Sequence, residues 1–372
     1  MPKVAVLKTN PDSVIQDYGR LLELAEFKKA ISPDKTTHLK INISWHKFYP
    51  ACSTTPWQLD AVIGKLLSSG FEKQKLLATQ NDTVVVSARE GAIGNRLDPV
   101  VKKYGIDYLY LNDPDSEWVK FEPKEKMLVL DKIYPEGIEI PRAFFDTNII
   151  HFPTMKTHVF TTMTGAVKNA FGGLLHKKRH WTHSVIHEAL VDLLAIQKEI
   201  HSGVFCVMDA AFSGDGPGPR AMKPHVTNLI LASSDPVALD TVAAKIMGFE
   251  PSSIDFIRIA NEKGFGCGDL KKIEVVGTDI SQMNLHFKGS EETFASRGQK
   301  LIYHGALKPL EKLLLRTPIV PWSYLASRLY HDVYWYNVFG RSRVKKMLKT
   351  DWGKLFLSYP GTSSSGRSGQ TR

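Results

Sequence analysis

The stretch Ile149-Ile-His-Phe152, followed by Lys156-Thr-His-Val-Phe-Thr-Thr-Met-Thr-Gly-Ala-Val-Lys-Asn-Ala-Phe-Gly-Gly-Leu-Leu-His176, decides the fold of this chain. Its mostly apolar first part is typical of a buried strand. The second part gathers lysine, histidine, asparagine, threonine and glycine residues within a short length of chain. A strand, a polar glycine-containing turn and a helix, in this order, are how α/β proteins build ligand sites. The segment therefore predicts an α/β fold with a ligand site inside it.

Strand-like and helix-like runs alternate on both sides of this segment. We expect strands at 4–7, 38–43, 75–80, 107–111, 204–209 and 226–232, and helices at 14–30, 56–67, 99–104, 186–200 and from Pro236 onward, where Asp235 is the expected N-cap. This alternation predicts a mainly parallel sheet with helices on both faces. Two further runs, 127–130 and 138–140, flank a turn that contains Pro135 and Gly137, and we expect them to form a hairpin.

Composition divides the chain into four parts. We expect an N-terminal α/β part at 1–145, a central α/β part that carries the candidate site at 146–300, a helical C-terminal region at 301–360 and a disordered Ser/Gly-rich tail at 361–372. The C-terminal region is rich in Trp, Tyr and Phe, and ten basic residues stand against three acidic ones between positions 301 and 354.

The overall composition excludes several classes of protein. The chain has 372 residues, 43% of them hydrophobic, and a net charge of +10, which favours anionic partners. No apolar run reaches the roughly 18 to 20 residues that span a bilayer, and the N-terminus lacks a signal-peptide pattern, so we expect the cytoplasm. Three cysteines lie far apart. We therefore expect neither a disulfide framework nor an iron–sulfur cluster held by this chain alone.

The centre of the candidate site is the segment after the strand at 149–152. Lys156 and His158 are two residues apart, so their side chains point to the same side of a strand. Lys168, Asn169 and the pair Gly172-Gly173 follow near a predicted turn or helix start, where backbone N–H groups could hold an anion. We interpret these residues as a site for a small anionic ligand. His158 is the candidate general acid or base, and the lysines neutralise ligand charge.

A run of histidines follows, with His176, His180, His183 and His187 spaced four, three and four residues apart. If this region is helical, the four side chains share one stripe, which could bind a metal through neutral imidazoles. The alternative is a solvated basic helix face, and spacing alone favours that alternative.

Two carboxylates near a glycine-rich loop are candidate metal ligands. Asp209 ends a predicted strand, five of the next ten residues are Gly or Pro, and Asp215 lies among them. An acid at a strand end followed by such a loop suits metal or substrate binding. A flexible surface loop explains the same pattern equally well.

Other polar residues near predicted strand ends complete the candidate set. Asp240 lies inside an otherwise apolar helix, so its carboxylate is either exposed or paired, and Ser234 could reach a ligand from a strand end. Lys40 and Asn42 alternate along a predicted strand and share one face. That face either contacts an anion or faces solvent.

Several common sequence motifs are missing. The chain has no Gly-x-Gly-x-x-Gly motif after its first strand, no Walker motif and no Gly-x-Ser-x-Gly elbow. It also lacks recognised zinc-finger and RNA-binding signatures. Nucleic acid is therefore the weakest of the partners that the positive charge suggests.

Taken together, the motifs resemble a bacterial and archaeal family known as domain of unknown function 362. The resemblance covers roughly residues 35–280 and is carried by Lys40-Ile-Asn42, where the family tends to have Lys-Pro-Asn, and by Thr54-Thr-Pro56, Lys156-Thr-His158, Thr164-Gly-Ala-Val-Lys-Asn169 with Gly172-Gly173, the Asp209 loop, and Ala232-Ser-Ser-Asp-Pro-Val-Ala-Leu-Asp240. Many family members carry an added ferredoxin-like segment with eight cysteines. This chain has none, which puts an intrinsic electron-transfer role in doubt.

A second, more remote resemblance is to the nickel-pincer lactate racemases. His158, Thr164-Gly165, Lys168 and His183 occur in the order and at the approximate spacing of that family's site. The resemblance implies that His158 moves a proton, Lys168 holds the cofactor and His183 ligates nickel. The second glycine of the family's turn is replaced by Ala166, and sequence outside this stretch does not match.

Two functions from different classes follow. The first is an enzyme, an isomerase or oxidoreductase, that transfers a proton or hydride on a small anionic substrate with the help of a divalent metal. The second is a non-catalytic binding or redox-accessory module that docks to a membrane surface or a protein partner through residues 301–360, where basic and aromatic residues suit an interfacial helix. An ordinary C-terminal subdomain with aromatic residues in its core is the alternative for that region.

Overall fold

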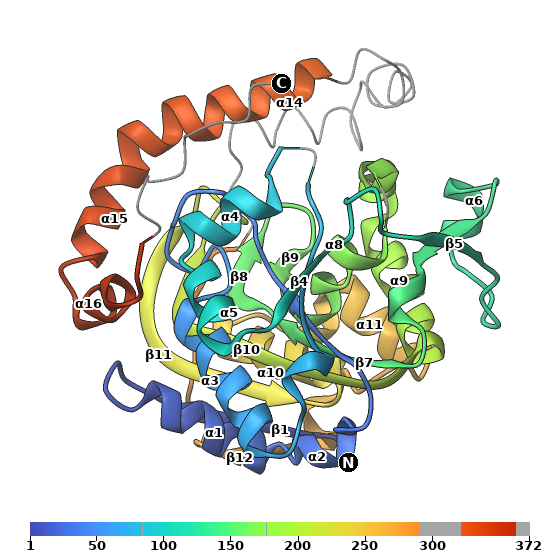
Figure 1. The fold of residues 1–372 in the computed structure, drawn as a ribbon, viewed down its shortest axis with the longest axis horizontal. Coiled ribbons are helices and arrows are strands. Elements are labelled where there is room, and N and C mark those ends of the chain that lie inside the picture. The colour runs from blue at the N-terminus through green and yellow to red at the C-terminus, as the bar shows by residue number, and fades with distance from the viewer. Residues whose placement is uncertain (84, 176, 290–320, 362–372) are drawn as a thin grey trace.

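The computed structural model describes residues 1–83, 85–175, 177–289 and 321–361, and its ribbon is drawn in Figure 1. Within these residues, ten strands form one sheet, whose main path runs β12-β1-β11-β10-β7-β2-β3-β4, with β8 and β9 attached to β10. The strands are β1 (Lys3–Lys8), β2 (Thr37–Ile41), β3 (Leu76–Gln80), β4 (Asp107–Tyr110), β7 (Thr147–Phe152), β8 (Thr154–His158), β9 (Thr162–Thr164), β10 (His201–Asp215), β11 (Lys223–Ser233) and β12 (Glu274–Gly277).

The sheet is mostly parallel. Its parallel core pairs β10 with β7, β7 with β2, β2 with β3 and β3 with β4. The long strand β11 runs antiparallel to both β1 and β10, and β9 runs antiparallel to β8. Parallel neighbours bring their carboxyl ends to one edge, where α/β proteins bind ligands.

Helices cover both faces of the sheet. The longer ones are α1 (Val14–Leu24), α3 (Pro56–Ser68), α5 (Asp98–Tyr104), α9 (Ile186–Ile200), α10 (Pro236–Met247) and α11 (Asp255–Glu262), and the shorter ones are α2 (Phe27–Ala30), α4 (Ala88–Gly94), α6 (Leu130–Ile133), α7 (Ala166–Asn169) and α8 (Phe171–Leu174). A 3₁₀ helix spans Lys177–Val185. Side chains from α1, α3 and α5 join one hydrophobic core, and side chains from α7 to α11 join a second core.

Strand alternation separates the two cores. Leu39 and Ile41 of β2 belong to the core formed with α1 and α3, so Lys40, between them, points to the opposite face. In β10, Val207 belongs to the first core and Met208 to the second. Lys40 therefore lies on the face of β2 opposite Leu39 and Ile41, as predicted. Its side chain is buried rather than exposed to solvent.

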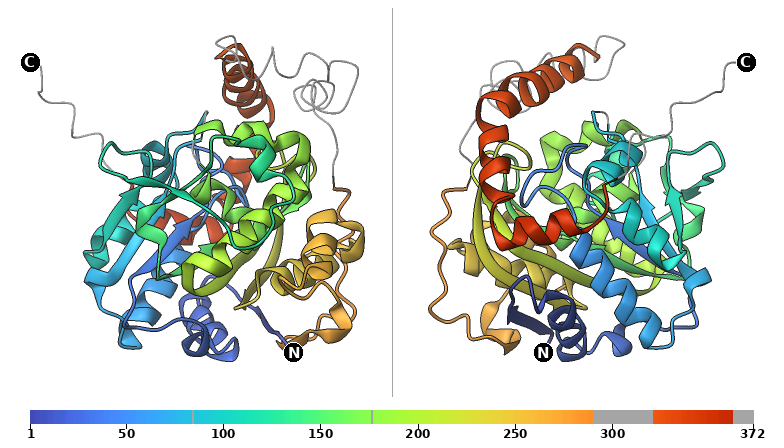
Figure 2. Two further views of the ribbon diagram at one scale, coloured as in Figure 1. Left: turned by 90° about the vertical axis from the view of Figure 1, so that its right-hand side faces the viewer. Right: turned by 60° about the vertical axis from the view of Figure 1, so that its left-hand side comes forward.

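The C-terminal helices lie along the rim of the domain, as Figures 1 and 2 show. They are α14 (Pro321–Arg328), a π-helical stretch at Leu329–Gly340, α15 (Arg341–Met347) and α16 (Asp351–Ser358). Trp335, Trp352 and Phe356 are buried in the first core, and the Trp352 indole donates a 2.8 Å hydrogen bond to Asn228. Part of the aromatic set is thus ordinary core, as one of the two sequence interpretations proposed.

Most expected elements are present, but the hairpin prediction is wrong. Leu130–Ile133 is a short helix, and β6 (Ile138–Pro141) pairs with β5 (Trp118–Phe121) in a separate two-stranded sheet. The segment Trp118-Val-Lys-Phe121 contains two aromatic residues and a valine, which favour strands, whereas the segment expected to pair, Met127-Leu-Val-Leu130, consists mainly of Met and Leu. The single helix expected over 14–30 is split into α1 and α2 by Glu26, whose φ is +55°.

Strands from both sides of residue 145 belong to the same sheet, because β1 lies between β11 and β12 and β2 lies beside β7. The four-part division of the chain stays a prediction. The predictions for 290–320 and 362–372 lie outside the described residues.

In the described ranges, no helix combines the length and the apolar character that crossing a membrane requires.

Asp209 ties β10 to two helices inside the first core. Its carboxylate accepts hydrogen bonds from the Tyr18 hydroxyl at 2.8 Å, the Thr55 hydroxyl at 3.0 Å and the Trp57 indole at 2.7 Å. A fourth bond comes from the backbone N–H of Ala211. Burial raises the pKa of Asp209 above its usual value, and the hydrogen bonds oppose that rise. The residue therefore acts as a fully satisfied buried link between strand and helices.

We expect Asp209→Ala to lower the free energy of unfolding by about 3 kcal/mol or more, because three buried donors lose their acceptor at once. Tyr18→Phe removes only one donor and is the matched control, with an expected loss of about 1 kcal/mol. Urea unfolding followed by circular dichroism measures both. A loss below about 1 kcal/mol for Asp209→Ala contradicts the structural role.

Candidate functional site

The candidate site lies between the sheet and the short helices α7 and α8. Its basic side chains come from three elements: Lys40 from β2, Lys156 and His158 from β8, and Lys168 from α7. The pKa of Lys168 is depressed partly by Lys156, and the pKa of His158 partly by Lys168 and Lys156. These side chains are therefore close enough to repel one another. Three of the predicted site residues, Lys156, His158 and Lys168, therefore lie close together, and their role in a site stays a prediction.

Lys156 is completely buried and surrounded by neutral oxygens. Its ammonium donates hydrogen bonds to the Cys52 carbonyl at 2.6 Å, the Thr154 hydroxyl at 2.9 Å and the Ser44 hydroxyl at 3.4 Å. Burial lowers the pKa of Lys156 to about 8. Asn42 lies next to this network, because its side-chain oxygen accepts a hydrogen bond from Ser44.

Lys40 is also buried, and it lies under the Gly172-Gly173 turn of α8. Its ammonium donates to the Ile41 carbonyl at 2.7 Å and to Gln80 at 2.6 Å. A Cβ atom added at Gly173 would lie 2.9 Å from the Lys40 side chain, so this glycine makes room for the lysine. Burial, and secondarily Arg179, lowers the pKa of Lys40 to about 7.

Lys168 is the member of the cluster that retains partial exposure. Its ammonium lies 4.8 Å from the centre of the Phe171 ring. In the described part of the chain, no hydrogen-bond acceptor contacts it. Burial, Lys156 and Arg179 together lower the pKa of Lys168 to about 8. A half-buried ammonium without an acceptor is unfavourable unless something negative binds beside it.

Arg179 is a further cation of the site that sequence analysis did not include among the site residues. It is buried, and its guanidinium donates to the carbonyls of Asp82 and Gly172. Burial lowers its pKa to about 10, with Asp82 acting in the opposite direction. The signal was visible as Lys177-Lys178-Arg179 beside the histidine run, but only the fold shows that the Arg179 side chain is buried.

No carboxylate pairs with the three lysines among the residues that the structure describes. Ion pairs in these residues involve surface lysines, such as Lys35 with Asp146 and Lys103 with Asp60, but none involves Lys40, Lys156 or Lys168. Buried charges in proteins are normally paired or bound to a counter-ion. The cluster therefore carries uncompensated positive charge.

His158 is held in one tautomer. The backbone N–H of Phe160 donates to its Nδ1 atom at 3.2 Å, which leaves the ring proton on Nε2. Burial and the surrounding cations keep the pKa of His158 well below its ordinary value. The imidazole is therefore neutral near pH 7 and presents an N–H donor.

The start of α7 is occupied by a carboxylate of the chain itself. Asp240 accepts hydrogen bonds from the backbone N–H groups of Ala166 at 2.6 Å and Val167 at 3.0 Å. A Cβ added at Gly165 would lie 2.0 Å from an Asp240 oxygen, so the glycine is required by this contact. Burial raises the pKa of Asp240 to about 7. Asp240 thus occupies the first N–H groups of α7, which directly precede the segment from Lys168 to Gly173 whose N–H groups were predicted to hold an anion.

Thr164 is a buried residue next to Lys156 whose side-chain hydroxyl lacks a hydrogen-bond partner. It faces Lys156 across the β8–β9 ladder, and no hydrogen-bond partner for its hydroxyl occurs within the described residues. Native proteins rarely leave such groups unsatisfied. Together with the Lys168 ammonium, this hydroxyl provides two open hydrogen-bonding groups in one region.

A second finding that sequence analysis missed is the network behind the lysines. His151 donates from Nε2 to the Gln197 side-chain oxygen of α9 at 2.7 Å, and its Nδ1 accepts from the Asn169 side-chain amide of α7 at 3.2 Å. Asn169 also donates to the Lys40 carbonyl at 2.9 Å. The interruption of the apolar stripe of α9 at Gln197 was the visible signal for this buried polar contact.

Ser234, a predicted site residue, is exposed beyond the end of β11.

The predicted metal ligands do not form a group. Among the residues that the structure describes, no three His, Cys, Asp or Glu side chains are placed to hold a metal. Asp209 and Asp215 lie six residues apart on the extended strand β10, which separates them by about 20 Å. Asp215 accepts from the backbone N–H groups of Gly216, Lys288 and Gly289. These carboxylates therefore do not fit a divalent metal held by the protein alone.

The histidine run does not lie on a single α-helix, which was the condition for the four-residue stripe. Residues 177–185 adopt a 3₁₀ helix, in which side chains three residues apart, such as His180 and His183, share one face, and α9 begins at Ile186. His183 packs between Phe160 and Phe171, and burial lowers its pKa to about 3. His176 lies outside the described residues. Lys168 and His183 both contact Phe171, but the cofactor roles implied by the racemase resemblance stay predictions.

Comparison with known proteins gives a family match and two distant similarities. A family model described as domain of unknown function (DUF362) matches residues 38–245. The thylakoid-associated protein sll1697 of Synechocystis sp. (strain ATCC 27184 / PCC 6803 / Kazusa) is 29% identical over 109 residues, which are 28% of this chain and 34% of that protein. The match thus spans about a third of that relative's length. A crystal structure of a Thermotoga maritima protein aligns with 58% of this chain and 53% of its own, at 13% identity and a TM-score of 0.34.

The lysines allow a test of stored charge repulsion. We expect Lys168→Met to be more stable than Lys156→Met by at least about 1 kcal/mol at pH 7. Both variants remove a cation whose pKa burial depresses, but only Lys156→Met leaves three acceptors, two of them buried, without their donor. Chemical denaturation of the two purified variants measures the difference. Equal stability argues against the assigned hydrogen bonds of Lys156.

The stability of Lys168→Met relative to the unsubstituted protein should also depend on pH. Lys168 has a folded-state pKa of about 8, below its ordinary value of about 10.5, so the unfolded chain binds the proton more tightly. The variant's advantage is therefore full below pH about 8 and shrinks as pH rises toward 10.5. Thermal midpoints across this range test it, with the exposed Lys263→Met as control. A constant advantage rules out the depressed pKa.

Proposed function

This chain belongs to the domain of unknown function 362 family, and we propose that it is an enzyme whose central segment binds a small anion and transfers a proton on it. One observation supports the proposal above all others: Lys156 lies close enough to Lys168 to depress its pKa, Arg179 adds positive charge beside both Lys168 and Lys40, and none of the three lysines has a carboxylate partner in the described residues. Such an arrangement costs stability in the absence of a ligand. Proteins keep such destabilising arrangements of charge mainly at functional sites.

Each group around the anion has a distinct role in this proposal. Lys168 binds the anion directly, because its ammonium is partly exposed and lacks an acceptor among the described residues. The Thr164 hydroxyl donates a hydrogen bond to the same ligand. Lys40 and Lys156, which are held by neutral oxygens, supply positive potential from behind.

His158 is the group that moves the proton. In the free protein it is a neutral imidazole with its proton on Nε2. A bound anion adds negative charge beside it and raises its pKa toward the range in which it exchanges protons near pH 7. Binding and catalysis are therefore linked, since the ring becomes an effective acid or base only when the ligand is present.

Anion binding is measured directly by isothermal titration calorimetry with inorganic phosphate, acetate and malonate as probes. We expect at least one probe to bind at pH 6.5 and to bind about tenfold or more weakly at pH 9, because Lys40, Lys156 and Lys168 lose protons between about 7 and 9. Lys168→Met should abolish binding. The control Lys263→Met makes the same charge change on an exposed surface and should leave binding intact.

Proton transfer is tested by incubating the protein with a panel of small carboxylates in D₂O. Enzyme-dependent exchange of a carbon-bound hydrogen, followed by NMR, is the expected result, and His158→Gln should reduce its rate by at least about a hundredfold. Binding without exchange for every member of the panel would leave a non-catalytic anion-binding module as the correct function. The absence of anion binding at every pH excludes both.

A further inference from the structure

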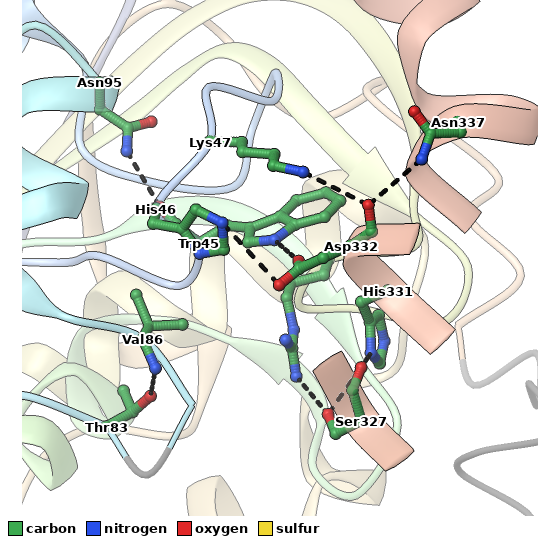
Figure 3. Close-up of polar contacts among 11 residues, drawn as sticks. Trp45, His46, Lys47, Thr83, Val86, Asn95, Ser327, His331, Asp332 and Asn337 are labelled. Atoms are coloured by element: carbon green, nitrogen blue, oxygen red, sulfur yellow. Dashed lines mark hydrogen bonds and ion pairs between the residues drawn. The ribbon is translucent and has the colours of Figure 1, made fainter. Parts of the chain in front are cut away.

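The C-terminal helix that runs from α14 through the π-helical stretch into α15 has an inner face bound to the body of the protein. Figure 3 shows Asp332 facing Trp45 and Lys47 of the loop after β2. The Trp45 indole donates to the Asp332 carboxylate, and the Lys47 ammonium donates to the Asp332 carbonyl at 3.3 Å. Trp335 packs against Tyr49 with ring centres 5.4 Å apart, and Arg343 donates to the Met222 carbonyl at 2.7 Å. These contacts fix how the helix is rotated about its axis.

The outer face of the same helix is apolar and exposed. Leu325 and Val333 each retain 60% of their accessible surface, a large fraction for side chains of this kind. The outer face as a whole consists of Leu325, Leu329, Val333, Tyr334, Val338 and Phe339. Six exposed large apolar side chains within one helix are more than scattered surface residues explain.

The helix geometry places these side chains in one stripe. Leu325, Leu329 and Val333 follow at intervals of four residues, and Val338 follows after five. A π-helix, with i→i+5 hydrogen bonds, has a wider turn than an α-helix, so an interval of five keeps Val338 close to the direction of Val333. The buried residues Trp335 and Gly340 show the same interval on the inner face.

Positive charge accompanies the stripe. Arg328, Arg341 and three lysines, at 345, 346 and 349, are exposed along the same helix and its end. Between positions 321 and 349 the chain has a single acidic residue, Asp332, and it faces inward. An exposed apolar stripe flanked by cations is the pattern of helices that lie in the interface of a membrane with anionic head groups.

We propose that this outer face docks the protein onto the surface of an anionic lipid bilayer, with Leu329, Val333 and Val338 entering the head-group region. The charge distribution favours lipid over a second copy of the chain. A twofold dimer through this face would oppose the same basic residues on each partner, and the whole chain already carries a net charge of +10. Head groups of negative charge complement it.

Co-sedimentation of the full chain with vesicles of phosphatidylglycerol and phosphatidylcholine in equal parts tests the proposal. We expect the protein to partition onto these vesicles and only weakly onto pure phosphatidylcholine, with binding reduced at high salt. The triple variant Leu329→Asn/Val333→Asn/Val338→Asn should weaken partitioning by at least about tenfold. Replacing Lys345, Lys346 and Lys349 by Gln should weaken it by roughly fivefold per residue.

The matched control replaces three exposed apolar residues elsewhere, Ile15, Ile93 and Val226, by Asn, and partitioning should be unchanged. Circular dichroism and thermal midpoints confirm that each variant folds. Equal partitioning of the stripe variant and the control overturns the proposal, as does a failure of the unsubstituted protein to bind anionic vesicles. Sedimentation equilibrium measures whether a second copy of the chain binds this face. If the protein self-associates through the stripe and does not bind vesicles, the face is a dimer interface and the proposal is wrong. Phosphate binding by the central site is measured separately and does not depend on these outcomes.

Discussion

A buried ammonium group needs hydrogen-bond acceptors and a negative counter-charge. None of the three lysines at the centre of this molecule has a counter-charge in the described residues, and Lys168 also lacks an acceptor there. Lys40 and Lys156 are satisfied by carbonyl, hydroxyl and amide oxygens, whereas Lys168 has only an aromatic ring beside it in the described residues. Burial depresses the pKa values of all three, and repulsion from neighbouring cations depresses those of Lys40 and Lys168 further. The surrounding structure must therefore be strong enough to hold them together.

That strength comes from polar links that join sheet and helices. Asp240 binds the first N–H groups of α7, and Asn169 at the other end of α7 binds the Lys40 carbonyl of β2. On the opposite face, Asp209 joins β10 to α1 and α3. The short helix α7 cannot be stable by itself, since isolated helices of this length do not form in water. Its position, and hence that of Lys168, depends on these contacts.

The C-terminal helices are joined to the same loops that support the site. Ser44 and Cys52, which bind the Lys156 ammonium, lie on the loop whose Trp45, Lys47 and Tyr49 contact the helix at Asp332 and Trp335. One loop therefore has two neighbours, the cation cluster on one side and the helix on the other. Contacts of the helix therefore bear on the loop that carries two of the oxygens bound to Lys156.

Local pattern alone determined the alternation of strands and helices, the cap of α10 by Asp235, and the gathering of Lys40, Lys156, His158 and Lys168, because strand periodicity and parallel order bring such residues to one edge. Tertiary structure decided the rest. The partner of β6, the carboxylate that fills the start of α7, the inward turn of Arg179 and the separation of Asp209 from Asp215 depend on contacts between residues far apart in the chain. The 3₁₀ helix after α8 and the π-helical stretch also depart from the period that sequence patterns assume, so neither the histidine arrangement nor the exposed stripe follows from spacing.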